Sequence, residues 1–176
     1  MQQNVIAERD KAAGVAAGGG QYLTFMLAGE EYGVDILRVQ EIRGWDNATQ
    51  IPNTPAYIKG IINLRGTIVP VVDLRRRFGM EPVEYGPTTV VIVLKVMDGD
   101  RSRIMGIVVD AVSDVYNISP SDMKLPPDFG AAINTEFVRG LATVSERMLI
   151  ALDIDRLLNA GPLGIAKDLE LPGHAA

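Results

Sequence analysis

Short apolar stretches separated by turn-forming residues run along the chain from Tyr22 onward. Apolar residues within 22–27 predict a first strand, Gly29-Glu30-Glu31 predicts a hairpin loop, and 32–37 predicts the returning strand. Residues 39–45 combine helical and extended features. The following stretch, 47–55, has the polar and Pro-rich character of a loop, with a short strand expected near its Ile51.

The clearest hairpin signal lies in the middle of the chain. Apolar runs at 60–64 and 68–72 flank Arg65-Gly66, which predicts a tight turn between two strands. Asp73 follows directly and is suited to cap a short helix that ends at Gly79.

The second half repeats this order of elements. Strands are predicted at 88–97 and 103–109 around the turn Asp98-Gly99-Asp100, and at 140–144 and 148–152 around the turn Ser145-Glu146. Between these hairpins lies a Pro- and Ser-rich loop, 119–129. Either Asp153 or Asp155 is expected to cap a last helix, 156–159.

An internal duplication explains this order. Residues 57–78 recur as 137–158, a constant 80 residues later and without a gap, so that Gly60 matches Gly140, Asp73 matches Asp153 and Arg76 matches Arg156. A period near 80 residues indicates two duplicated small domains rather than a solenoid, whose repeats are about 20–50 residues long. Features shared by the copies are expected to serve the fold, whereas differences between them are candidates for function.

The duplication and the short strands together predict an all-β fold of two small five-stranded barrels packed together, with short helices. The first barrel is placed near 22–82 and the second near 87–158, within a domain at 21–160. Each barrel alone would have a thin core, so we expect the two to share apolar surface with a groove between them. Residues 1–20, rich in Ala and Gly, predict a flexible arm, and 161–176 predict a tail.

Composition excludes several functions. The net charge of -5 argues against nucleic-acid binding, which needs a basic face. The chain has no cysteine, which rules out disulfides and thiolate chemistry, and its single histidine, His174, lies near the end of the sequence. The first residues show no secretory signal and no apolar run is long enough to span a bilayer, so we expect no direct membrane insertion.

No pattern in the chain predicts a catalytic or metal site. Asp73 and Asp153 are expected to be helix caps, Glu30-Glu31 a hairpin tip, and Asp98-Gly99-Asp100 lacks the further oxygens of a calcium loop. We therefore expect no cofactor and no metal, and we favour a binding protein over an enzyme. A small hydrolase or lyase with an unrecognised carboxylate site stays open as an alternative.

The two copies differ at one exposed position of the predicted hairpin. Copy one has Arg65-Gly66 at its tip, where copy two has Ser145-Glu146. The preceding segment also differs and carries Glu41 and Trp45 in copy one, of which Trp45 is either an interface anchor or ordinary core. These differences predict that copy one carries a binding surface.

At these residues the chain resembles the CheW chemotaxis coupling proteins. The resemblance rests on GEEYGVDILRVQEIRG, IPNTPAYIKGIINLRGTIVPVVDLRRRFG, TVVIVLKV and GIVVDAVSDV, in that order. It implies two intertwined SH3-like β-barrels and a non-enzymatic adaptor. Such an adaptor couples the cytoplasmic tips of methyl-accepting chemotaxis receptors to the regulatory domain of the histidine kinase CheA, and a cytoplasmic location at receptor arrays is implied. Other copies of the adaptor itself are further candidate partners.

The resemblance also implies which residues bind. The receptor-side positions are Ile36, Val39, Glu41, Arg65, Val90 and Val115. The kinase-side positions are Gly60, Lys124 and Phe129. At Lys124 an arginine is expected from the resemblance, and lysine lacks the planar fork that makes bidentate contacts. The alternative functions on the same fold are a CheW-like regulatory module of another chemosensory system and a CheV- or CheA-type signalling protein.

Overall fold

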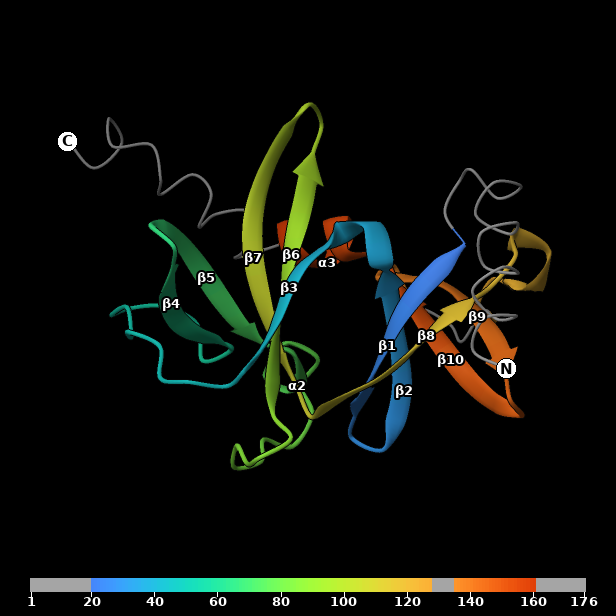
Figure 1. Cartoon of the computed structure of the whole chain (residues 1–176), viewed down its shortest axis with the longest axis horizontal. Helices are drawn as coiled ribbons and strands as arrows, with labels where there is room; N and C mark the ends of the chain where they lie inside the picture. Colours follow the sequence, from blue (N-terminus) through green and yellow to red (C-terminus); the bar gives the residue numbers. More distant parts are fainter. Residues whose placement is uncertain (1–19, 128–134, 161–176) are drawn as a thin grey trace.

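Ten strands form two five-stranded sheets in the computed structural model, which describes residues 20–127 and 135–160 (Figure 1). The first sheet has the order β8-β1-β2-β10-β9, with bounds Ala111–Asn117, Gln21–Leu27, Glu30–Asp35, Arg147–Leu152 and Val138–Val144. The second has the order β3-β6-β7-β5-β4, with bounds Val39–Gly44, Val90–Asp98, Arg101–Val109, Thr67–Asp73 and Ile58–Leu64. The predicted all-β class with short helices is confirmed. The predicted arm, except Gly20, and the predicted tail lie outside the described residues.

Within the described residues, four short helical turns accompany the strands, namely η1 (Ile36–Arg38), α2 (Leu74–Arg77), η2 (Pro120–Asp122) and α3 (Ile154–Asn159). Asp73 caps α2 by accepting a hydrogen bond from the Arg76 N–H at 3.2 Å. Asp153 caps α3 in the same way, with the Arg156 N–H at 3.1 Å. Of the two predicted caps for the last helix, Asp153 is therefore the correct one.

The hairpins follow the sequence pattern with one shift. The tight turn at Arg65-Gly66 is confirmed, with φ angles of 50° and 90°. The first hairpin turns at Ala28 and Gly29, whose φ angles are 53° and 81°, so Glu30 and Glu31 begin the strand β2 rather than form the loop. The predicted return strand 32–37 ends earlier, at Asp35, because the chain turns into η1 there.

The duplication is visible in the backbone contacts. The Asp73 N–H bonds to the Tyr57 carbonyl at 2.7 Å, and 80 residues later the Asp153 N–H bonds to the Phe137 carbonyl at 2.9 Å. Two isolated β-bridges are also related, because Thr49 pairs with Ile61 and Lys124 pairs with Leu141. The copies are therefore equivalent in space as well as in sequence.

The sheets do not follow the barrel bounds predicted from the repeat, 22–82 and 87–158. The hairpin β1–β2 lies in one sheet with β8, β9 and β10 from the second half, and β6–β7 lies in the other with β3, β4 and β5 from the first half. Two parallel pairs, β2 with β10 and β5 with β7, join the halves. This exchange corrects the contiguous bounds and agrees with the intertwined barrels that the resemblance implies.

The length of one connection explains the exchange. β2 ends beside the beginning of β1, where Asp35 pairs with Tyr22. The position on the other side of β1 belongs to β8. β8 begins beside the end of β1, where Ala111 pairs with Met26. If β3 took the place of β8, the three residues of η1 would have to cross β1 and also run along its whole length before β3 could begin. Continuing directly into the other sheet needs no such return.

Three apolar clusters result from this arrangement. The largest contains side chains from both sheets and both α-helices, including Phe25, Val34, Ile92 and Leu157, all fully buried. A second cluster lies within the β3-to-β4 sheet, and a third within the β8-to-β9 sheet. The shared central cluster is the apolar surface that two thin barrels need, and it fixes the sheets against each other.

Two bidentate ion pairs join the sheets at the places where the chain crosses between them. At the β2-to-β3 crossover, Arg38 NH2 lies 2.7 Å from Asp155 Oδ2. At the β7-to-β8 crossover, Arg75 NH2 lies 2.7 Å from Asp110 Oδ2. All four side chains are more than two thirds buried, where paired charges interact more strongly than at the surface. We call these pairs the first and the second crossover clamp.

Acid should weaken the fold through these clamps. The hydrogen bond from Arg75 holds the pKa of Asp110 below its ordinary value, although burial opposes it. Burial also opposes ionisation of Asp155, but hydrogen bonds from Arg38 and the Met97 N–H lower its pKa overall. Because folding lowers both pKa values, their contribution to stability is complete above about pH 4 and is lost as the pH falls further.

The expected result is a melting temperature that falls below about pH 4, measured by circular dichroism from pH 7 to pH 2.5. Asp110→Asn should be less stable at pH 7 but should lose less on acidification, because the residue that takes up the proton is gone. An acid response of Asp110→Asn as steep as that of the unchanged chain would contradict this account of the second clamp.

Candidate functional site

An ion pair connects the two edge strands of the β3-to-β4 sheet. Glu41 lies on β3, one edge strand, and Arg65 lies at the tip of the hairpin that carries β4, the other edge strand. Arg65 NH2 is 2.7 Å from Glu41 Oε1. The Arg65 side chain is 74% exposed and that of Glu41 only 25%. The two charged receptor-side residues expected from the sequence therefore form one ion pair, with Arg65 exposed and Glu41 half-buried.

The turn geometry is what presents Arg65. Its positive φ is rare for a residue other than glycine, and the Gly66 N–H is satisfied by the Asn63 side chain at 2.8 Å. The equivalent tip, Ser145-Glu146, also has positive φ at both residues. The backbone of the tip therefore belongs to the fold in both copies, and the arginine is what distinguishes copy one.

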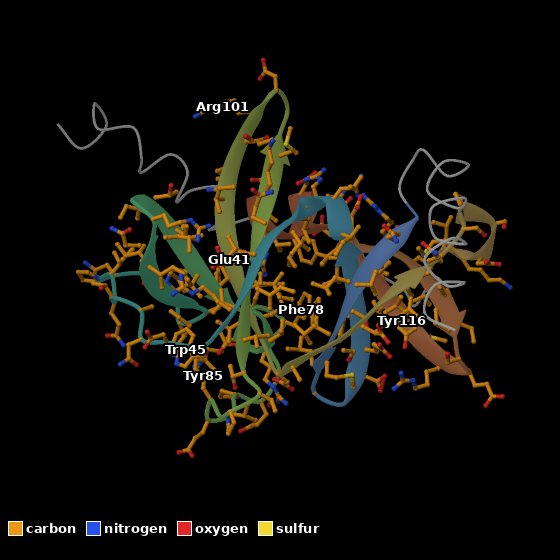
Figure 2. The ribbon with its side chains drawn as sticks, viewed as in Figure 1. Glu41, Trp45, Phe78, Tyr85, Arg101 and Tyr116 are labelled. Atoms are coloured by element: carbon orange, nitrogen blue, oxygen red, sulfur yellow. The ribbon has the colours of Figure 1, made fainter. Side chains whose placement is uncertain are left out.

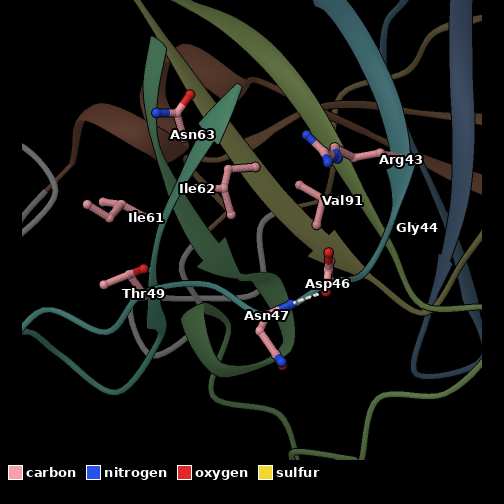
Figure 3. A pocket seen from close by; sticks show the side chains of 9 residues that line it. All are labelled: Arg43, Gly44, Asp46, Asn47, Thr49, Ile61, Ile62, Asn63 and Val91. Carbon is pink, nitrogen blue, oxygen red and sulfur yellow. Dashed lines mark hydrogen bonds between the residues drawn. The ribbon is translucent and has the colours of Figure 1, made fainter. Parts of the chain in front are cut away.

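A cavity lies between the two edge strands of this sheet, β3 and β4 (Figure 3). Its lining combines apolar and polar side chains, with Ile62 and Val91 on the inner side and Arg43 and Asn63 toward the rim. The full lining is Arg43, Gly44, Asp46, Asn47, Thr49, Ile61, Ile62, Asn63 and Val91.

The four apolar receptor-side residues share one environment. Ile36, Val39, Val90 and Val115 are all half-buried and pack against the central cluster between the sheets. They come from η1, β3, the start of β6 and β8, so they border the junction of the two sheets from both sides. Ile42, on the same strand as Val39, is 42% exposed.

Trp45 belongs to the interior of the second sheet rather than to a free surface. Its ring packs edge-on against Tyr85 with the centroids 4.6 Å apart (Figure 2). Both residues border the apolar cluster of that sheet. Of the two roles left open for Trp45, core packing is the one that the structure supports.

The repeat-related carboxylate Asp73 has a structural environment. It is 3% exposed, caps α2 and accepts a hydrogen bond from the Tyr85 hydroxyl. Burial and this hydrogen bond raise the pKa of Tyr85, so the hydroxyl remains protonated at neutral pH. Among the described residues no group of three or more potential metal ligands occurs, and none of the described helices is long and apolar enough to cross a membrane.

Gly60, expected on the kinase side, is required by the fold. Its φ is +135°, and a Cβ at this position would overlap the carbonyl oxygen of Thr49 and lie 2.7 Å from its carbon. Thr49 exchanges two backbone hydrogen bonds with Ile61 directly beside it. Gly140 in copy two is approached in the same way by Met123 and Lys124. The close passage of a loop over the strand explains why both copies have glycine here.

The kinase-side residues do not form one cluster. Gly60 lies on β4 and Lys124 is bridged to β9, and these strands lie at opposite ends of the molecule (Figure 1). Phe129 lies outside the described residues. Gly60 adjoins the bridge between Thr49 and Ile61 in copy one, whereas Lys124 is itself part of the equivalent bridge, with Leu141, in copy two.

Sequence reasoning missed an apolar surface beside Lys124. Leu125 is 83% exposed and Met148 is 55% exposed, and both line a shallow groove at the β9–β10 end. The groove is lined by Ser121, Asp122, Lys124, Leu125, Pro127, Leu141, Ala142, Thr143 and Met148. Met148 matches Ile68 in the repeat, and Ile68 is also exposed, at 56%, but the apolar match alone favours burial and gives no sequence signal of an exposed surface.

Comparisons with protein families and with individual proteins both find similarity to CheW proteins. Residues 21–161 match the family model described as the CheW-like domain. The chemotaxis protein CheW of Klebsiella aerogenes is 45% identical over 164 residues, which cover 93% of this chain and 96% of that protein. The chemotaxis protein CheW of Rhizobium meliloti is 39% identical over 78% of this chain and 86% of its own length.

A solved structure has the same fold. The crystal structure of the scaffolding protein TtCheW from Thermoanaerobacter tengcongensis superposes with a TM-score of 0.73 and 35% identity. The match covers 82% of this chain and 95% of that one.

Proposed function

The chain belongs to the CheW family of chemotaxis scaffold proteins, and from this premise we propose that it couples chemoreceptors to the histidine kinase CheA at cytoplasmic receptor arrays. The observation that carries the proposal is the extent of the match, which spans residues 21–161 and reaches 45% identity to a chemotaxis protein CheW. The family is one of non-enzymatic scaffolds, so the chain transmits signals by binding rather than by chemistry.

The receptor surface is proposed at the junction of the two sheets. Ile36, Val39, Val90 and Val115 supply half-buried apolar surface, as a helical receptor tip laid into a groove would need. The exposed pair of Glu41 and Arg65 adds charge on the outer side of β3. Charges at such a rim fix orientation and partner choice more than they raise affinity.

The kinase surface is proposed at the ends of the molecule. Lys124 is exposed and adjoins the apolar groove that contains Leu125 and Met148, a combination of a basic rim and apolar side chains suited to a protein partner. Gly60 lies at the opposite end. Because the two ends are far apart, Lys124 and Gly60 cannot contact one small surface of a single kinase domain, and each end needs its own contact.

A weak affinity for each partner suits this role. Interfaces that bury about 800 Å² on each partner are compatible with micromolar dissociation constants, or about -8 kcal/mol. Several such contacts made together give an assembly much higher avidity than one contact has.

The groove beside Lys124 provides the test of the kinase surface. Leu125→Asp should weaken binding to the CheA regulatory domain at least about tenfold, because a charge replaces an apolar side chain within an interface. The fold should be unaffected, since Leu125 is 83% exposed. Isothermal titration calorimetry with the regulatory domain and, separately, with a receptor signalling fragment measures both affinities.

Val83→Asp is the matched control, because Val83 is also exposed, at 47%, but lies on the loop between α2 and β6. Only Leu125→Asp should lose kinase affinity, and both variants should retain receptor affinity. Equal kinase binding by Leu125→Asp and the unchanged chain would remove the kinase surface from this groove.

A further inference from the structure

The two crossover clamps occupy equivalent places in the two copies, but the positions of their arginine and aspartate are exchanged. Arg75 and Asp155 occupy equivalent positions in the helices that follow the two repeated hairpins, exactly one repeat of 80 residues apart. In the second clamp the helix contributes the arginine and the crossover contributes Asp110. In the first clamp the helix contributes the aspartate and the crossover contributes Arg38.

Each clamp also holds the backbone of a strand in the other sheet. Asp155 Oδ1 accepts the Met97 N–H at 2.8 Å, and Arg38 NH1 donates to the Lys95 carbonyl at 3.1 Å, both on β6. Asp110 Oδ2 accepts the Ala28 N–H at 2.9 Å at the end of β1. A bidentate pair with further backbone bonds fixes both distance and orientation, which a single contact does not.

The clamps lie beside the apolar residues of the proposed receptor surface. Arg38 stands between Ile36 and Val39 in the sequence. Asp110 follows Val109, which pairs with Val90. It also immediately precedes β8, the strand that carries Val115. Each clamp is therefore joined through a few residues of backbone to one side of that surface.

We propose that Arg38 and Asp155, together with Arg75 and Asp110, are positioning residues that set the separation of the two sheets at the receptor-binding surface. This inference rests on the proposed receptor role of that surface. The four residues act through the backbone of η1, β3, β6 and β8 and need no contact with the receptor. Receptor affinity then depends on clamps whose helices lie outside the surface itself.

Asp155→Asn and Asp110→Asn test the proposal. Asparagine retains an oxygen that can accept the Met97 or Ala28 N–H but loses the charge that pairs with arginine. We expect receptor affinity to fall about fivefold to tenfold in either variant, with kinase affinity changed less than about twofold. Arg156→Gln is the matched control, because Arg156 is the next residue of α3, is 67% exposed and pairs with its own helix cap, Asp153, at 3.7 Å.

A distance measurement separates positioning from a general loss of stability. The chain has no cysteine, so spin labels can be attached at Gln40→Cys on β3 and Ser113→Cys on β8, two exposed positions in different sheets. Electron–electron double resonance on the free protein should give a narrow distance distribution for the unchanged clamps and a wider one for Asp155→Asn. A purely structural role would lower the melting temperature without changing either the distribution or the receptor affinity of the folded protein.

The combined variant Arg38→Gln/Asp155→Asn should bind the receptor no more weakly than Asp155→Asn alone, because both substitutions break the same pair. Additive losses, an unchanged distance distribution, or unchanged receptor affinity in Asp155→Asn would each overturn the positioning role. If the unchanged chain fails to bind a matched receptor fragment, the proposed function fails instead, and the distance distributions still decide whether the clamps set the separation of the sheets.

Discussion

Replacing Gly60 with alanine should destabilise the protein by about 3 kcal/mol, which combines the strain of a positive φ with the loss of backbone hydrogen bonds. The added Cβ would overlap the Thr49 carbonyl, which belongs to the backbone and cannot move aside as a flexible side chain would. The two hydrogen bonds between Thr49 and Ile61 would be lost as the loop lifts away. Gly60→Asp should be at least as damaging, so a loss of kinase binding in that variant would reflect the disturbed fold rather than a lost contact.

Gly140→Ala is the matched control for this prediction. Gly140 holds the equivalent place in copy two, but its φ is not positive. The nearest atoms to a Cβ there belong to the Met123 side chain, Cγ at 2.5 Å and Sδ at 2.7 Å, and the Lys124 carbonyl oxygen is farther away, at 3.0 Å. Urea denaturation followed by circular dichroism should show a clearly larger loss for Gly60→Ala than for Gly140→Ala. Stability of Gly60→Ala equal to that of the unchanged chain would contradict the structural role of this glycine.

Reversing the charge of Arg65 should weaken receptor binding strongly but lower the stability of the fold only slightly, in contrast to the substitution of Gly60. Arg65→Glu turns the contact with Glu41 into a repulsion, but its side chain is 74% exposed, so the stability cost should stay below about 1 kcal/mol. Receptor affinity should fall at least about tenfold, because the rim would present a negative charge where it now presents a positive one. Calorimetric titration with a receptor signalling fragment measures the loss, and thermal unfolding verifies the fold.

The charge-exchanged variant Glu41→Arg/Arg65→Glu distinguishes two explanations. This variant restores the ion pair with the two charges exchanged, so the contact between the edge strands β3 and β4 should be kept. If the receptor contacts the charged side chains directly, its binding stays weak in the exchanged variant, because each charge is in the wrong place. Recovery of full receptor affinity would show that the pair matters only for closing the sheet.

Local features of the fold could be predicted because neighbouring residues determine them. The turn at Arg65-Gly66 and the cap at Asp73 depend on a few adjacent residues, and both are confirmed. The prediction of a hairpin loop at Gly29-Glu30-Glu31 is wrong for Glu31, which is buried on β2 and paired with Arg147 at 3.2 Å. Its partner is 116 residues away, so no local pattern could reveal the pairing.

The strand exchange and the distribution of the site residues depend on long-range contacts. A repeat indicates that two units are equivalent but not which hairpin pairs with which set of strands, and the contiguous bounds were wrong for this reason. The contact between Glu41 and Arg65 and the separation of Gly60 from Lys124 follow from the sheet order. The sequence could name these residues as candidates, but only the fold assigns them to surfaces.

The central claim is that the chain couples receptors to the kinase, and the most direct test measures autophosphorylation of CheA. Purified kinase and a receptor signalling fragment are mixed with and without the chain, with Arg65→Glu as a folded control of impaired receptor binding. The account predicts that receptor control of the kinase appears only when the unchanged chain is present. The same autophosphorylation rate with and without the well-folded chain, with matched partners, would contradict the coupling role.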